Sequence, residues 1–129
     1  MKILIVSQYF WPENFSINTI AKYLSTKGHE VDILTGLPNY PQGKVYSGYT
    51  EKKNHHQQYE GCKVDRVWIK ERGEKGGDKR LILNYLSYTV NASLNILTRL
   101  NKKYDVAFVY EVSPITQAYP ALLLRKLRK

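Results

Sequence analysis

A chain of 129 residues has room for one domain, and its 43% apolar residues allow a real hydrophobic core. Charged residues make up an ordinary 24%, which argues against a wholly disordered chain. The 20 basic residues outnumber the 11 acidic ones, and the net charge of +9 favours an anionic partner such as membrane lipid, nucleic acid, pyrophosphate or phosphosugar.

The cysteine content and the two ends of the chain narrow the class of protein further. Cys62 is the one cysteine, which excludes an internal disulfide bond and a cysteine-based zinc site. The apolar run at residues 3–7 is too short for a secretory signal, so we expect a cytoplasmic protein. Residues 122–129 form an amphipathic helical pattern with no terminating glycine, and we expect the chain to be a piece of a larger protein.

The first third of the chain predicts a strand, a helix and a second strand. Residues 3–7 and 31–35 are short apolar runs, typical of fully buried strands. Between them, Ser16 is placed to cap a helix, because apolar residues recur at helical spacing from Ile17 to Leu24. Gly28 follows where a left-handed cap belongs. The segment therefore predicts a βαβ unit.

A long loop and a hairpin follow this unit. Residues 36–49 contain two prolines and three glycines, and loops of this length in compact domains are usually functional or mobile. Residues 55–59 and 63–69 predict two paired strands, joined by a turn at Glu60-Gly61-Cys62.

The rest of the chain predicts helix, strand and helix. Residues 78–101 read as one long helix and residues 105–110 as another strand. Ser113-Pro114 is typical of a helix cap followed by proline in the first turn. This element order predicts an α/β fold with a mostly parallel sheet and helices on both of its faces.

The long helix carries a polar stripe of uncharged side chains on one face: Asn84, Ser87, Asn91, Asn95 and Thr98. Residues 81–98 contain no charge, but the amides and hydroxyls make a membrane span a poor interpretation. Solvated helix faces usually carry Lys and Glu, so the polar stripe favours contact with another surface. That surface belongs to the same domain, to another domain or to a membrane.

Three segments should emerge beyond the carboxyl ends of the parallel strands, where open sheets of this kind bind ligands. The first, residues 8–16, lacks the glycines of a dinucleotide site, and the chain has no Walker sequence. It offers aromatic rings, which stack on sugars, beside carboxylate and amide groups that bind hydroxyls. The candidate ligand-binding residues here are Tyr9, Trp11, Glu13, Asn14 and Asn18. The alternative is that the rings simply plug the end of the sheet.

The second and third segments add four candidates. Asn39 and Tyr40 lie between two prolines and form either a binding loop or a turn-rich connection. Glu111 ends a predicted strand, and the helix predicted to open at Ser113 can bind an anion through its free N–H groups. The alternative is that Ser113 only caps the helix while Glu111 interacts with the helix dipole.

Other chemistries find little support. Neighbouring His55 and His56 on a strand point to opposite faces without a carboxylate at ligand spacing, so we expect no metal site. Cys62 has no local histidine partner, which makes a catalytic thiol improbable. The basic groups accompany no nucleic-acid motif, so nucleic acid is a weak hypothesis. They suit an anionic membrane surface better, the alternative being a solvated basic surface.

Two segments are the most distinctive: residues 2–15, with Gln8-Tyr9-Phe10-Trp11-Pro12-Glu13-Asn14-Phe15, and residues 34–41, with Gly36-Leu37-Pro38-Asn39-Tyr40-Pro41. Together with residues 27–31, they resemble the amino-terminal domain of family 4 glycosyltransferases. Gly28-His29-Glu30-Val31 recurs across many glycosyltransferases. Tyr110-Glu111-Val112-Ser113-Pro114 is similar to a Tyr-Glu-Pro-Ser-Pro segment of the fucosamine-transferase-like subgroup, from which Val112 departs.

The resemblance implies a Rossmann-like domain over residues 1–129, the amino-terminal half of a GT-B architecture, cut before its last elements. This half takes the acceptor, a lipid-linked saccharide of bacterial polysaccharide synthesis, and needs no cofactor or metal. A carboxyl-terminal domain, absent here, holds the nucleotide-sugar donor and the main catalytic positions, so this chain alone should be inactive. The alternative is a non-catalytic binding or membrane-recruiting subunit that partners a separate donor-domain chain.

Overall fold

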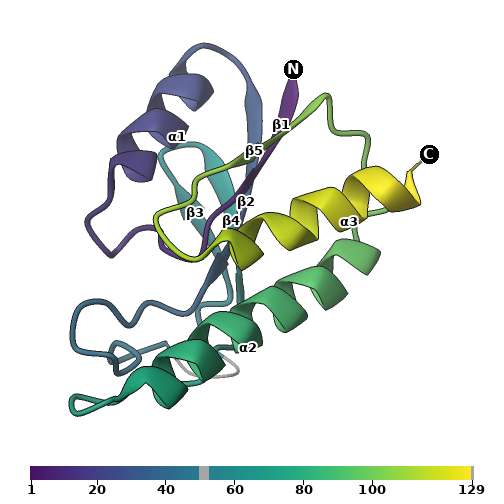
Figure 1. Cartoon of the computed structure of the whole chain (residues 1–129). Coiled ribbons are helices and arrows are strands. Elements are labelled where there is room, and N and C mark those ends of the chain that lie inside the picture. The colour runs from purple at the N-terminus through teal and green to yellow at the C-terminus, as the bar shows by residue number, and fades with distance from the viewer. Residues whose placement is uncertain (50–52, 129) are drawn as a thin grey trace.

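The computed structural model describes residues 1–49 and 53–128, so Lys129, the last of the carboxyl-terminal basic residues, lies outside the described residues (Figure 1). Within that part of the chain the strands are β1 (Lys2–Val6), β2 (Glu30–Gly36), β3 (His56–Tyr59), β4 (Cys62–Val67) and β5 (Val106–Val109). The helices described are α1 (Ser16–Thr26), α2 (Asp78–Leu97), the short 3-10 helix η1 (Ile115–Ala118) and α3 (Tyr119–Leu127).

The strands form one sheet in the order β3-β4-β2-β1-β5. β1 pairs in parallel with β2 and β5, and β2 pairs in parallel with β4, while β3 and β4 form the antiparallel hairpin. The predicted α/β fold with a mostly parallel, Rossmann-like sheet is confirmed. Because the chain steps from β1 to β2 on one side and later returns to β5 on the other, the strand order reverses between β1 and β5. Ligand crevices of open α/β sheets form beyond the carboxyl ends of the strands at such a point.

Helices cover both faces of the sheet, as predicted: α1 covers one, and α2 and α3 lie side by side on the other (Figure 1). Successive residues of a strand point to opposite faces. Ile3 and Ile5 therefore pack under α1, and Leu4 and Val6 pack under α2 and α3. Burial on both faces explains why β1 is a continuous apolar run instead of an alternating one.

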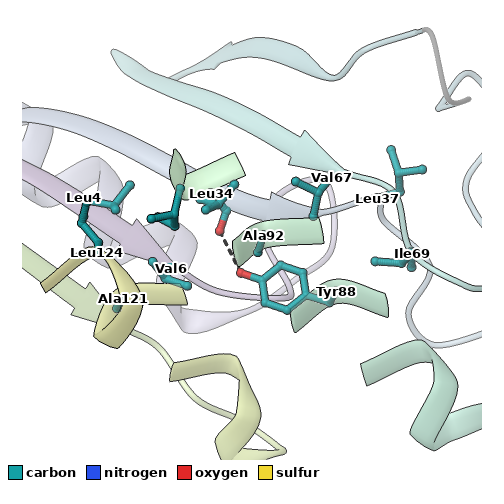
Figure 2. Packing of buried hydrophobic residues seen from close by; sticks show 11 residues of the cluster. Leu4, Val6, Leu34, Leu37, Val67, Ile69, Tyr88, Ala92, Ala121 and Leu124 are labelled. Carbon is teal, nitrogen blue, oxygen red and sulfur yellow. Dashed lines mark hydrogen bonds between the residues drawn. The ribbon is translucent and has the colours of Figure 1, made fainter. Parts of the chain in front are cut away.

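Tyr88 is the largest aromatic side chain in the core beneath α2. Its ring is fully buried, and its hydroxyl donates a hydrogen bond of 3.1 Å to the carbonyl of Leu34 on β2 (Figure 2). The bond satisfies the one polar group that the ring carries into the core. It also ties α2 to β2 at Leu34 and so fixes the position of the helix on the sheet.

The polar stripe of α2 packs inside the domain, on the chain that leaves β4. Asn91 donates to the carbonyl of Trp68 at 3.0 Å, Ser87 accepts from the amide of Lys70 at 2.7 Å, and Asn84 donates to the carbonyl of Lys70 at 2.7 Å. The stripe thus supplies the backbone of this segment with partners that a neighbouring strand would otherwise provide. Of the three interpretations given above, contact within the same domain is confirmed for Asn84, Ser87 and Asn91, while Thr98 is exposed.

Element ends differ from the predictions where distant contacts decide them. Ser16 is the first helical residue instead of the cap, because Phe15 takes the cap position in extended backbone while its ring stacks on Tyr9. Cys62 belongs to β4, since Glu60 and Gly61 alone make the hairpin turn, both at positive φ. The long helix ends at Leu97, four residues before its predicted end.

The prediction that Ser113 caps a helix is wrong. Pro114 is extended and precedes η1, and α3 begins only at Tyr119. The side chain of Gln117 explains the delay, because it donates to the carbonyl of Ser113 at 2.7 Å and so holds the chain in a tight turn. The anion site predicted at this helix start is therefore not formed, since η1 has only four residues.

None of the helices in the described residues combines the length and the apolar character needed to cross a bilayer.

Replacing Tyr88 tests the packing of α2 on the sheet. We expect Tyr88→Ala to lower the free energy of unfolding by about 3–5 kcal/mol, because a large buried ring is lost. Tyr88→Phe should cost only about 1 kcal/mol, because one hydrogen bond is lost while the carbonyl of Leu34 keeps the amide of Ser7 as a donor. Urea unfolding of the three proteins measures both values, and a cost below 1 kcal/mol for Tyr88→Ala would contradict the packing described.

Candidate functional site

The loops that follow β1 and β2 run together beyond the carboxyl edge of the sheet. The carbonyl of Gln8 accepts from the amide of Gly36 and from the hydroxyl of Thr35, both at 3.1 Å, so the pairing of β1 and β2 continues past the end of β1. A Cβ at Gly36 would lie 3.0 Å from Ile69 and 3.2 Å from the carbonyl of Gln8, which explains the glycine. Both loops therefore leave the sheet from a fixed point.

Beyond that point lies a group of buried polar side chains that we call the edge network. Each member is at most 1% exposed, and together they come from four parts of the chain. The edge network consists of Gln8, Glu13, Asn39, Asn84 and Gln117. Its members connect the loops after β1 and β2 with α2 and with η1.

Glu13 is the acceptor that joins the two loops. One carboxylate oxygen accepts from the backbone amides of Asn39 and Tyr40 at 2.8 and 2.7 Å, and the other accepts from the amide of Phe10 at 3.3 Å. Burial raises the pKa of the Glu13 carboxyl, although the three N–H groups favour the charged form. Both oxygens thus serve the backbone of the loops, which are held as one unit.

Amide side chains extend this unit to the helices. Gln8 donates to Asn84 at 2.8 Å, and Asn84 in turn lies 3.5 Å from the side-chain oxygen of Asn39. The side-chain oxygen of Gln117, in η1, accepts from the backbone amide of Gln8 at 2.9 Å. The side-chain oxygen of Gln8 is buried and has no hydrogen-bond partner among the residues that the structure describes.

Aromatic rings of the two loops cluster at this edge. Tyr9 stacks on Phe15 with the ring centroids 5.0 Å apart, and Tyr40 completes the cluster at 5.8 and 5.2 Å from these two rings. A second contact places the ring of Trp11 5.3 Å from that of Tyr59 on the hairpin. The rings partly plug the end of the sheet and partly face solvent, since Tyr40 is 44% exposed.

The structure divides the predicted ligand-binding residues into two sets. Tyr9, Glu13 and Asn39 are buried, and the side chain of Asn18 bonds the amide of Trp11 and the carbonyl of Glu13. These four side chains build the loops. The residues that solvent reaches are Trp11, Asn14, Tyr40, Glu111 and Ser113.

The loop after β5 joins this edge only in part. The carbonyl of Ser113 contacts Gln117 and so reaches the edge network. Glu111 is exposed, and within the described part of the chain no hydrogen bond or ion pair links it to the other candidates. The first two loops therefore form one structural unit, while the third lies next to it.

Arg66, on β4, is a buried cation next to the first loop. It is 3% exposed, bonds the side chain of Gln57 and the carbonyl of Trp11, and lies 5.1 Å from the centre of the Tyr49 ring. Burial lowers the pKa of its guanidinium group. Its position behind Trp11 supports the first loop from the hairpin side.

A groove of about 360 Å³ lies between the loop after β2 and the segment after β4. Its floor is apolar and its rim carries both charged and aromatic side chains. The lining residues are Leu37, Val45, Tyr49, Trp68, Ile69, Lys70 and Glu71.

Sequence reasoning missed Gln8 and Gln117, because their partners are distant in the chain. For Asn84 a signal was present in the uncharged polar stripe of α2.

In the described ranges, 1–49 and 53–128, no group of three or more His, Cys, Asp or Glu side chains is placed to hold a metal ion. Comparison of the chain with protein-family models and with curated proteins gave no match.

Removing the Glu13 carboxylate tests its structural role. Glu13→Ala leaves three loop amides without their acceptor, so we expect it to lower the free energy of unfolding by about 1–3 kcal/mol and to speed proteolytic cleavage within residues 36–49. Glu60→Ala is the control, because Glu60 is exposed and its carboxylate pairs with Lys22 at the surface. Equal cleavage rates in the two variants would contradict the role given to Glu13.

The titration of Glu13 gives a prediction with a definite sign. Because its pKa is raised above the usual 4.5, the folded chain binds the proton more tightly than the unfolded chain does. Glu13→Gln removes this titration. We expect the unfolding free energy of the wild type minus that of Glu13→Gln to fall as the pH rises from about 4.5 through the folded-state pKa, and then to level off. Urea unfolding across the acidic to neutral range measures the difference, and a rise with pH would refute the assignment.

Proposed function

We propose that this chain is the acceptor-binding domain of a retaining glycosyltransferase. The reaction transfers a sugar from a nucleotide-sugar to a lipid-linked saccharide during the synthesis of a bacterial surface polysaccharide. The residue pattern of the first two loops, given above as a resemblance to family 4 glycosyltransferases, supports this reaction class. The observation that carries the proposal is structural: the exposed ring of Tyr40 and the partly exposed ring of Trp11 stand on loops that the edge network holds at the carboxyl edge of a parallel sheet.

The chemistry of the edge suits a sugar better than a nucleotide. Trp11 and Tyr40 offer ring faces to the C–H faces of a sugar, and the exposed side chain of Asn14 can bond hydroxyls. A nucleotide pyrophosphate needs glycines that let the backbone approach it, and the loop after β1 has bulky rings there instead. The groove beside Trp68 offers room for a further sugar unit of the acceptor.

The proposal assigns donor binding and catalysis to a second domain. The donor and the acceptor then meet in a cleft between the two domains. The carboxyl edge of this sheet lines the acceptor side of that cleft. The proposal further implies that the protein works in the cytoplasm at the inner face of the cell membrane, because its acceptor carries a lipid anchor.

Saccharide binding by the solvent-accessible rings of Trp11 and Tyr40 tests the proposal. The 129-residue chain is applied to an array of bacterial surface oligosaccharides, and the affinity for each bound glycan is compared among variants. We expect Trp11→Ala and Tyr40→Ala each to weaken binding about tenfold, the loss of roughly 1.4 kcal/mol of contact. Tyr23→Ala is the matched control, because Tyr23 is a 59% exposed ring at the far end of α1.

Two results would contradict the proposal. One is an array on which the wild type binds no saccharide. The other is saccharide binding that neither Trp11→Ala nor Tyr40→Ala weakens.

A further inference from the structure

The outer face of α2 carries large apolar side chains that the domain leaves uncovered. We call them the apolar stripe: Ile82, Leu83, Leu86, Val90, Leu94 and Leu97, each 45–58% exposed. Their spacing of three and four residues sets them on one side of the helix, opposite Tyr88, Ala92 and Ile96, which face the sheet. Single exposed apolar residues are common on soluble proteins, but a row of six along one helix marks a contact surface.

The neighbouring helix extends this surface. α3 packs beside α2 on the same face of the sheet (Figure 1), and its Ala121 and Leu124 belong to the buried core (Figure 2). Its outer side therefore faces the same way as the apolar stripe. Tyr119 and Leu122 on that side are 54% and 57% exposed, and Ile115 in η1 is 76% exposed.

Most of the positive charge lies in the second half of the sequence, and part of it borders this surface. From residue 70 onward the sequence has 12 basic and 5 acidic residues, a net +7 of the chain's +9. Lys79 and Arg80 are exposed in the first turn of α2, and Arg125, Lys126 and Arg128 are exposed at the end of α3. Between residues 81 and 98 the sequence has no charge, so the cations border the apolar stripe without interrupting it.

We propose that the outer face of α2 and α3 docks on an anionic phospholipid bilayer, with α2 lying in the plane of the membrane. The apolar stripe would enter the boundary between headgroups and acyl chains, and the bordering cations would contact lipid phosphates. A second copy of the chain fits less well, because pairing two such faces would bring like charges together.

This inference deepens the proposed function and rests on it, because the proposed lipid-linked acceptor is the reason for the protein to bind a membrane. Asn84 belongs both to the first turns of α2 and to the edge network. Docking by α2 would therefore hold the candidate site next to the bilayer, where the saccharide of such an acceptor begins.

Vesicle flotation with the full 129-residue chain tests the docking face. The probes are vesicles of equal parts phosphatidylglycerol and phosphatidylcholine, and vesicles of phosphatidylcholine alone, none carrying saccharide. We expect the wild type to float with the anionic vesicles and the Leu86→Gln/Leu94→Gln variant to bind them at least about tenfold more weakly. The control is Tyr23→Gln, an exposed ring on the opposite face of the sheet, which should bind as the wild type does.

A second variant tests the charges. Replacing Arg125, Lys126 and Arg128 by Gln should weaken binding to the anionic vesicles by about fivefold for each residue and reduce the effect of salt. These side chains are exposed, so circular dichroism melts of the variants should match the wild type, which separates lost docking from lost folding.

Each remaining outcome decides against the proposal. No flotation of the wild type overturns it, and so does flotation that the Leu86→Gln/Leu94→Gln variant keeps. Self-association of a non-floating wild type, abolished by the same variant, would assign the apolar stripe to contact between copies. Because the vesicles carry no saccharide, these failures leave saccharide binding on the array untouched, and the two proposals are judged separately.

Discussion

The edge network is the constraint on which the candidate site depends. A buried carboxylate and four buried amides are costly to remove from water unless their polar groups find partners, and here most of them do so across segments far apart in the sequence. Glu13 contributes most, because a single side chain accepts from three loop amides. The loops after β1 and β2 thereby acquire the rigidity of the sheet from which they emerge.

The hydrogen bonds of the edge network determine which side chains are left to contact a ligand. Glu13, Asn18 and Asn39 are committed to the backbone, so an incoming molecule meets chiefly the rings of Trp11 and Tyr40 and the side chain of Asn14. Such a surface selects for flat apolar faces with a few hydroxyls. Helix α2 contributes to two surfaces. One of its sides supports the loops through Asn84, and another side carries the apolar stripe.

Local pattern was enough to predict the order of the elements. The apolar runs of β1 and β2, the helical spacing of α1 and the glycine at residue 28, whose φ is +84°, depend on near neighbours, and the structure has them as expected. The burial of Glu13 and the late start of α3 could not be predicted in the same way. Glu13 is fixed by amides 26 and 27 residues away, and Gln117 by an amide 109 residues away. A sequence pattern shows that a carboxylate is present but does not show which backbone groups will reach it.

Amide hydrogen exchange is the most direct test of the edge network in solution. If Glu13 holds the two loops as described, the amides of Phe10, Asn39 and Tyr40 should exchange only through global unfolding, as slowly as those of β1 and β2. Exchange of these three amides at the rate of an exposed loop, while the strands stay protected, would show that the edge is not preformed and would contradict this account.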